Sequence, residues 1–220
     1  MQNRKDPDPI EVAPEPKPSA KLRPKRNVCV FCGSGPGRSP EYVKAAHAFG
    51  QSLAGAGFGL VYGGGGLGLM GETARSALSA GGYVTGIIPE FLVNKERMLH
   101  DVDEMIVTHN MHERKQRMFE HSDAFVALPG GIGTLEELVE QMTWAQLGQH
   151  DKPIVLANVD NFWAPLRHLL DHMRQEAFIR PGLDVRYAII DRTEDVVPYL
   201  AEAFARGAAA ETGEQLIEKF

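Results

Sequence analysis

The chain has 220 residues, a mass of 24.2 kDa and a formal net charge of −6 at pH 7. This length suits one α/β domain with a full core and excludes a nucleotide domain followed by a large, separate substrate domain. The acidic balance argues against nucleic acid as a partner, and no apolar stretch reaches the ~20 residues of a membrane span.

Residues 1–26 have the composition of a disordered tail. Prolines recur there among mixed charges with almost no large apolar groups, so nothing offsets the entropy cost of ordering the chain. The segment also lacks the apolar core of a signal peptide, which favours a cytoplasmic location. Its basic cluster of Lys21, Arg23, Lys25 and Arg26 is more typical of a solvated leader than of a contact with an acidic partner.

From residue 27 onward, short runs rich in β-branched and aromatic residues alternate with helical patterns. The predicted strands are 28–31, 59–62, 83–88, 105–108, 124–128, 154–157 and 188–190. The predicted helices are 40–56, 68–80, 112–121, 134–147, 161–174 and 194–206. This alternation predicts an α/β fold in which a Rossmann-like, doubly wound parallel sheet forms a single domain over residues 27–206, followed by a flexible tail over 207–220. Ligands bind such a sheet beyond the carboxyl ends of its strands.

The first predicted strand contains Cys29, and Cys32, the other cysteine of the chain, follows it directly, before a glycine-rich turn that begins with Gly33 and Ser34. C-x-x-C spacing occurs in redox pairs, but such a pair usually opens a helix, where its thiolate is stabilised. Residues three apart on a strand face opposite sides, so a disulfide between these two would be strained. We therefore predict two buried, free cysteines.

A second glycine-rich turn follows the second strand and includes Gly64 and Gly65. It continues as a G-x-G-x-x-G motif at residues 66–71, and Glu90 follows about 20 residues later, as in the fingerprint of dinucleotide-binding sites. The motif is weak by itself, follows the second strand rather than the first, and has no substrate domain after it. A nicotinamide cofactor is therefore not the favoured interpretation.

Two charged residues, Arg114 and Lys115, lie near the start of the helix after the fourth strand, so they can reach the sheet edge where the glycine turns gather. An isolated pair of this kind is more often solvated surface charge. Nearby, His109, His112 and His121 have no recognised metal-ligand spacing with cysteines or carboxylates. We expect neither a metal nor another cofactor.

The most informative segment follows the fifth strand, where Gly130, Gly131, Gly133 and Thr134 stand between an apolar run and a helical pattern. Free N–H groups and the dipole at a helix start attract anions, and glycines let the backbone approach an oxyanion closely. The segment therefore predicts a phosphate site. Thr134-x-x-Glu137 also fits a helix capping box, and the two interpretations are compatible.

The same helix carries two adjacent glutamates whose side chains point in different directions. At about 100° per residue, Glu137 lies on nearly the same side as Thr134, whereas Glu136 points away. We therefore predict that Glu137, and not Glu136, takes part in chemistry.

These segments resemble two signatures of the LOG ("Lonely Guy") family. The pattern PGGxGTxxE is matched by Pro129, Gly130, Gly131, Gly133, Thr134 and Glu137, and the pattern MHxRK by residues 111–115. The resemblance covers about residues 27–205. It implies hydrolysis of the N-glycosidic bond of a purine or cytokinin nucleoside 5'-monophosphate, such as AMP or isopentenyladenosine monophosphate, to the free base and ribose 5-phosphate. Members were once labelled lysine decarboxylases, a label that these residues do not support.

The resemblance also implies which residues form the site. Arg114 and Glu137 are the expected catalytic residues. The expected substrate contacts are Gly33, Ser34, Gly64, Gly65, Glu90, Arg114, Lys115, Gly130, Gly131, Gly133, Thr134, Glu137 and Thr143. A homodimer or larger homo-oligomer, with the pocket completed from both subunits, is likewise implied. In addition, Trp144 and Leu147 give the long helix more apolar surface than one core face needs.

Two other functions stay open at this point. A non-catalytic carrier of a nucleotide or of the molybdenum cofactor would keep the glycine loop but would need neither Arg114 nor Glu137. An NAD-dependent oxidoreductase would rest on the weak G-x-G-x-x-G motif alone. The joint presence of Arg114 and Glu137 favours the enzyme.

Overall fold

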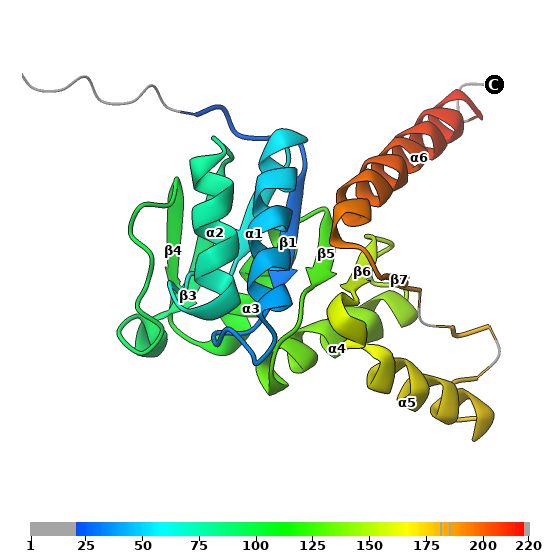
Figure 1. Ribbon diagram of the computed structural model, residues 1–220. Coiled ribbons are helices and arrows are strands. Elements are labelled where there is room, and N and C mark those ends of the chain that lie inside the picture. Colours follow the sequence, from blue (N-terminus) through cyan, green and yellow to red (C-terminus); the bar gives the residue numbers. More distant parts are fainter. Residues whose placement is uncertain (1–20, 181, 185, 218–220) are drawn as a thin grey trace, which may run out of the picture.

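The computed structural model describes residues 21–180, 182–184 and 186–217 (Figure 1). Within these residues, seven parallel strands form one sheet. They are β1 (Asn27–Phe31), β2 (Gly59–Tyr62), β3 (Val84–Pro89), β4 (Glu104–Thr108), β5 (Ala124–Ala127), β6 (Ile154–Ala157) and β7 (Ala188–Ile190). Each predicted strand is present, and its ends differ from the prediction by one residue at most.

Helices connect the strands. They are α1 (Pro40–Gly55), α2 (Gly68–Ser79), α3 (Met111–Glu120), α4 (Ile132–Gln146), α5 (Ala164–Gln175) and α6 (Val196–Ile217), with the short 3-10 helices η1 (Glu90–Leu92), η2 (Val159–Asn161) and η3 (Thr193–Asp195). In the part of the chain that the structure describes, no helix combines the length and the apolar character needed to cross a lipid bilayer.

The ends of four helices lie within two residues of the prediction, and two helices differ by more. Helix α5 begins later than predicted because Asp160 and Asn161 have left-handed backbones, with φ values of 51° and 57°, which interrupt a helix. Helix α6 runs on past residue 206 to Ile217, through an alanine-rich stretch that favours helix. The distal half of α6 projects away from the sheet in Figure 1.

The strand order is β4-β3-β2-β1-β5-β6-β7. The chain builds outward from β1 to β4 and then returns to the other side of β1 with β5, where Val28 pairs with Ala124 and Phe31 with Ala127. The predicted doubly wound parallel sheet is thereby confirmed. The connections after β1 and β5 leave the sheet in opposite directions, and the crevice between them is where such folds bind ligands.

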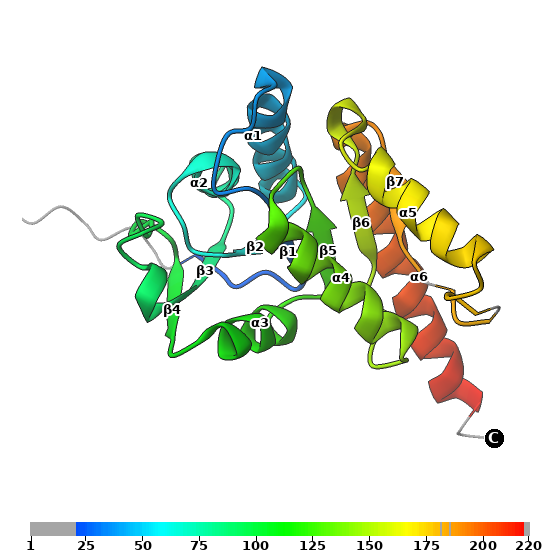
Figure 2. The same ribbon diagram turned by 90° about the horizontal axis from the view of Figure 1, so that it is seen from below.

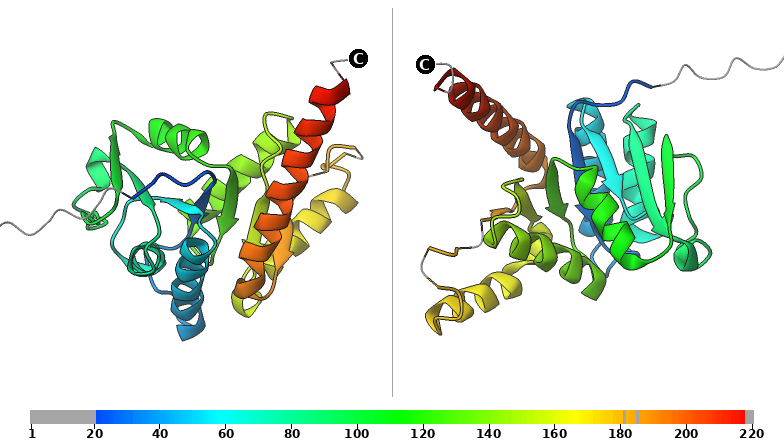
Figure 3. Two further views of the ribbon diagram at one scale, coloured as in Figure 1. Left: turned by 90° about the horizontal axis from the view of Figure 1, so that it is seen from above. Right: turned by 180° about the vertical axis from the view of Figure 1, so that it is seen from behind.

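Strand β1 is buried on both faces, and its side chains enter two separate cores. Val28 and Val30 pack with residues of α1, α2 and α6, whereas Cys29 and Phe31 pack with residues of α3, α4 and α5. The view from behind in Figure 3 shows α3 and α4 in front of the sheet, on the side opposite α1 and α2. Continuous apolar strands of this kind are typical of a parallel sheet that is covered on both faces.

The two cysteines are buried and free, as predicted. Cys29 belongs to the core beneath α3, α4 and α5, and Cys32 to the core beneath α1 and α2. Their side chains therefore leave the chain on opposite sides of the sheet. Burial raises the pKa of both thiols, so they are neutral at physiological pH.

The basic cluster before β1 contacts the folded chain itself. Lys21 Nζ lies 3.1 Å from an Asp103 carboxylate oxygen, and Arg26 Nη1 lies 2.8 Å from one of Asp123. Residues 1–20 of the predicted tail lie outside the described residues. Because the observed pairs are partly exposed, each contributes little to stability, about 0–1 kcal/mol.

Candidate active site

Three glycine-rich turns meet at the carboxyl ends of β1, β2 and β5, the edge onto which Figure 2 looks. The Gly33 N–H donates to the Pro129 carbonyl over 3.0 Å, and the Gly33 carbonyl accepts from the Leu69 N–H, also over 3.0 Å. A Cβ on Gly33 would lie 3.1 Å from the Gly35 carbonyl oxygen and 3.4 Å from the Gly130 Cα. The close approach of these turns therefore favours glycine at this position.

Helix α4 begins at Ile132, with Gly131 as its N-cap in an extended conformation and no side-chain cap. The capping-box interpretation is therefore wrong, because Thr134 lies inside the first turn. Its buried side chain packs over Gly130, where a Cβ would overlap the Thr134 hydroxyl. The first N–H groups of a helix, here those of Ile132 and Gly133, have no carbonyl partner within the helix and are available to an anion.

A cavity of about 260 Å³ opens at this helix start. Its walls come from the turn after β1, from α3 and α4, and from the connection between β3 and β4. The expected site residues that line it are Gly33, Ser34, Arg114, Gly131, Gly133, Thr134 and Glu137. The fold thus brings together, in one cavity, residues that are up to about one hundred positions apart in the sequence.

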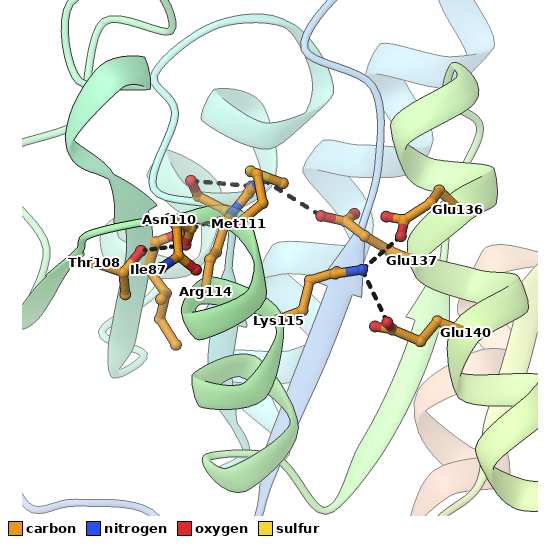
Figure 4. A network of polar contacts seen from close by, with 10 residues as sticks. Ile87, Thr108, Asn110, Met111, Arg114, Lys115, Glu136, Glu137 and Glu140 are labelled. Atoms are coloured by element: carbon orange, nitrogen blue, oxygen red, sulfur yellow. Dashed lines mark hydrogen bonds and ion pairs between the residues drawn. The ribbon is translucent and has the colours of Figure 1, made fainter.

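Arg114 and Glu137 form a buried ion pair in this cavity (Figure 4). Arg114 Nη1 lies 3.5 Å from Glu137 Oε1, and the two side chains are only 7% and 10% exposed. Arg114 Nε donates to the Ile87 carbonyl over 3.2 Å, and Nη2 donates to the Gly63 carbonyl over 3.4 Å. Strand β3 and the turn after β2 therefore fix the guanidinium, which in turn faces the carboxylate from α4.

Burial raises the pKa of Glu137 to about 7, because removal from water disfavours the charged carboxylate. The Arg114 guanidinium opposes this effect, whereas the charges of Glu136 and Glu96 add to it. At neutral pH the Glu137 carboxyl is therefore poised between its two protonation states. Such a group can both accept and donate a proton.

Lys115, the other half of the Arg-Lys pair, points elsewhere. Its ammonium group lies 2.6 Å from a Glu136 carboxylate oxygen and 2.8 Å from one of Glu140, and its side chain is only 12% exposed (Figure 4). Lys115 thus joins α3 to α4 and does not line the cavity. Glu136 completes this link with a side chain that is 51% exposed.

Two further expected contacts lie away from the cavity within one chain. Glu90 is in η1, with its side chain 65% exposed and 3.5 Å from the His109 ring. It follows β3, and two strands separate β3 from β5 in the sheet. Thr143 lies on the exposed side of α4, where its hydroxyl donates to the Val139 carbonyl over 2.8 Å.

The remaining expected glycines lie beside the cavity and not in its wall. Gly130 lines a neighbouring hollow of about 250 Å³, whose lining shares Gly33, Ser34 and Gly131 with the cavity. Gly64 and Gly65 hold the connection between β3 and β4: the Gly64 carbonyl accepts from the Leu99 N–H over 3.1 Å, and Gly65 forms an antiparallel bridge with Met98.

That connection brings in a residue that sequence reasoning missed, Glu96, which lines the cavity with Arg114 and Glu137. Burial raises its pKa, and Arg114 opposes the shift. Glu96 stands in a mixed, charged stretch with no periodicity. Nothing in the local sequence indicates that its carboxylate is directed inward.

Comparisons with known proteins agree on one family. A family model described as "Possible lysine decarboxylase" matches residues 70–200. The cytokinin riboside 5'-monophosphate phosphoribohydrolase of Rhodococcoides fascians is 44% identical over 181 residues, which cover 81% of this chain and 91% of that protein. A cytokinin riboside 5'-monophosphate phosphoribohydrolase of Arabidopsis thaliana is 50% identical over 157 residues, covering 71% of this chain and 69% of the other.

Among solved structures, the molybdenum cofactor binding protein from the phototrophic bacterium Rippkaea orientalis has a similar fold. The TM-score is 0.58 at 26% identity, over 84% of this chain and 99% of that chain. The fold is therefore shared between proteins with different names, and function has to be argued from the site.

Proposed function

Because the chain belongs to the family of the cytokinin riboside 5'-monophosphate phosphoribohydrolases, the LOG family, we propose that it hydrolyses the N-glycosidic bond of purine nucleoside 5'-monophosphates, with AMP and isopentenyladenosine monophosphate as substrates. The observation that best supports this proposal is the buried pair of Arg114 and Glu137, 3.5 Å apart in the cavity at the start of α4. The pair places a titratable carboxylate next to an anion-binding helix start.

The 5'-phosphate binds at the start of α4. The N–H groups of Ile132 and Gly133 donate to it, together with the Thr134 hydroxyl, and the helix dipole favours its charge. Among the described residues that line the cavity, Arg114 is the one cation. The phosphate is therefore held mainly by backbone dipoles, which leaves Arg114 to hold Glu137.

Glu137 acts on the sugar. As the bond between C1' and the base nitrogen breaks, its electron pair leaves with the base, and the ribose gains oxocarbenium character. The ionised Glu137 carboxylate stabilises that positive charge and accepts a proton from the water whose oxygen bonds to C1'. The departing base takes up one proton from solvent, and Glu137 afterwards releases to solvent the proton that it took from water, so the net reaction consumes one water and gives the free base and ribose 5-phosphate.

The substrate assay compares AMP, isopentenyladenosine monophosphate and adenosine, with chromatography of the released base. Both monophosphates should yield free base. The kcat/KM for adenosine should be lower by at least about a hundredfold, because the binding energy of the phosphate positions the ribose. Inorganic phosphate should compete with AMP. Equal cleavage of adenosine and AMP would show that the start of α4 does not anchor the substrate.

A non-catalytic carrier is the alternative function, which the similarity to the Rippkaea protein keeps relevant. A carrier would bind a nucleotide or cofactor and return it unchanged. It would have no need for a buried carboxyl whose pKa is about 7 and which faces an arginine. Recovery of intact AMP after prolonged incubation would favour the carrier.

We also propose that the chain forms at least a homodimer through α4 and α5. Large apolar side chains are exposed on both helices: Ile132 and Val139 on α4, with Leu147 at its C-cap, and Leu169 and Met173 on α5. On α4 they recur at spacings of about two turns, so they share one side of the helix. Contiguous exposed apolar surface of this kind marks an interaction site.

Trp144, which the sequence places on that surface, packs instead within the chain. Its ring meets Phe119 of α3 edge-on, with 5.1 Å between the ring centroids. Thr143, by contrast, is exposed on α4 near Val139. Thr143 lies away from the cavity of its own chain. In a dimer built on α4, it would therefore contact the substrate that is bound in the pocket of the partner subunit.

A further inference from the structure

Residues 128–131, which we call the β5–α4 turn, link the end of β5 to the start of α4. Two hydrogen bonds hold this turn from the side of β1. The Leu128 N–H donates to the Phe31 carbonyl over 3.0 Å, and the Pro129 carbonyl accepts from the Gly33 N–H, also over 3.0 Å. Packing adds little at Gly131, where a Cβ would meet no atom of a non-neighbouring described residue within 4 Å. Because glycine has wide conformational freedom, the position of the turn depends on its hydrogen bonds.

Trp163, the N-cap of α5, holds the same turn from the other side. Its indole N–H donates to the Ala127 carbonyl, the last one of β5, over 3.1 Å, and this hydrogen bond is buried. Trp163 is only 4% exposed, and it lines a hollow of about 320 Å³ whose wall also includes Gly130, Gly131 and Ile132. The indole therefore lies beside the turn and is bonded to the residue that precedes it.

Trp163 is itself fixed by the end of β6. Its backbone N–H donates to Asn158 Oδ1 over 2.8 Å, and Asn158 Nδ2 donates to an Asp191 carboxylate oxygen, also over 2.8 Å. The ring of Phe162 meets the indole edge-on, with 5.0 Å between the ring centroids. Trp163 is thus held through both its backbone and its ring, so the indole N–H is a donor in a fixed position.

A buried indole N–H usually finds a hydrogen-bond acceptor, and many such bonds serve only to satisfy the donor. The informative feature here is which acceptor it finds. The Ala127 carbonyl stands directly before the turn that presents the N–H groups of Ile132 and Gly133. A shift at Ala127 is therefore passed on to the groups that bind an anion.

We propose that Trp163 is a positioning residue for the phosphate site, and that its hydrogen bond to the Ala127 carbonyl holds the β5–α4 turn where the start of α4 meets the 5'-phosphate. The inference rests on the proposed function and adds a residue that acts through the turn without touching the substrate. Groups that bind an anion work best when they are in place beforehand, so a small displacement is costly. Loss of the indole N–H should therefore weaken ligands that carry a phosphate and spare those that lack one.

The test compares AMP with adenosine in four forms of the protein. They are the wild type, Trp163→Phe, a replacement of Trp163 by β-(3-benzothienyl)alanine, in which sulfur takes the place of the indole N–H at nearly the same ring shape, and Trp144→Phe. The preference for AMP over adenosine, measured as a ratio of kcat/KM values, should fall at least about fivefold in both forms altered at Trp163. That factor is expected for the loss of one hydrogen bond between neutral groups.

Trp144→Phe is the matched control and should keep the wild-type preference, because Trp144 packs on Phe119 of α3. The inhibition constant of inorganic phosphate against AMP should rise in both forms altered at Trp163 and stay unchanged in this control. A merely structural role of Trp163 would lower the cleavage of AMP and adenosine by the same factor and leave the ratio as it is in the wild type. Thermal melting of each form establishes that it is folded.

The benzothienyl replacement separates the hydrogen bond from packing. A wild-type ratio in that form, with a reduced ratio in Trp163→Phe, would show that the shape of the ring and not its N–H supports the turn, and would overturn the proposal.

Equilibrium binding separates this inference from the proposed function. In a Glu137→Gln background, calorimetric affinities for AMP and adenosine, with Trp163 and with each replacement, give the same ratio without turnover. If AMP is hydrolysed but neither ratio changes when the indole N–H is lost, the role of Trp163 is wrong and the proposed function stands. If AMP is bound and never hydrolysed, the proposed function fails, and the binding ratios still decide whether Trp163 positions the phosphate site.

Discussion

Glu137 and Glu136 are neighbours on α4, yet their surroundings are opposite. The Glu137 side chain is 10% exposed and faces Arg114, whereas that of Glu136 is 51% exposed and pairs with Lys115. Burial, and not sequence context, therefore makes Glu137 the glutamate that titrates near neutral pH.

The activity should depend on pH through Glu137. Its pKa of about 7 predicts that kcat/KM rises with pH and reaches half its maximum near pH 7, because we propose that the ionised form acts on the sugar. Arg114→Gln should move this midpoint upward, since the guanidinium lowers the pKa of Glu137. Arg117→Gln, on the same helix, should leave the midpoint in place. A profile that stays flat between pH 5 and pH 9 would exclude the assigned role of Glu137.

The free energy of unfolding should depend on pH through the same residue. Because folding raises the pKa of Glu137 from 4.5 to about 7, its contribution to stability is fully present below pH 4.5 and is lost as the pH rises through about 7. The loss amounts to at most about 3 kcal/mol. Urea unfolding at pH 5 and pH 8 should show a smaller difference in Glu137→Gln than in the wild type. An unchanged difference would mean that Glu137 is not buried as described.

At the scale of elements, α3 and α4 are joined by Lys115. The resemblance implies a substrate contact for this residue, but its ammonium group is engaged by Glu136 and Glu140. Lys115 therefore sets the position of α4 relative to α3, and with it the distance between Arg114 and Glu137.

Lys115→Met should lower the free energy of unfolding by about 2 kcal/mol, because it leaves a half-buried Glu140 unpaired. Adding Glu140→Gln to Lys115→Met should restore part of that loss, since the unpaired charge is then gone. Urea titrations of the wild type, the two single variants and the double variant give the coupling free energy between Lys115 and Glu140. Strictly additive losses would show that the two residues do not interact.

The sequence predicts the elements better than the contacts between them. Each strand follows from a continuous apolar run, which a sheet covered on both faces requires, and the direction of Glu137 follows from local helix geometry. The sequence places the start of α4 two residues too late, because Gly131, and not Thr134, is its N-cap. The inward direction of Glu96 and the pairing of Lys115 depend on segments distant in the sequence, which no local pattern reveals.

At the scale of the whole molecule, the doubly wound order places the turns after β1 and β5 side by side, and the site follows from that arrangement. The exposed apolar side chains of α4 and α5 predict a homodimer that forms through these two helices. Val139→Glu should convert a dimer to a monomer in light scattering, because Val139 is exposed between Ile132 and Leu147 along α4. Val107→Glu, at an exposed valine of β4, should leave the dimer intact. A wild-type monomer that is active at micromolar concentration would contradict the proposed assembly.

We propose that Glu137 acts on a nucleotide held at the start of α4. The most direct measurement is the release of adenine and ribose 5-phosphate from AMP by the wild type, Glu137→Gln and Glu136→Gln. The wild type should form the two products in equal amounts. Glu137→Gln should remain folded and lose activity by a factor of about 10² to 10⁴, whereas Glu136→Gln should stay within a few-fold of the wild type. Adenine release by Glu137→Gln at the wild-type rate would contradict the account.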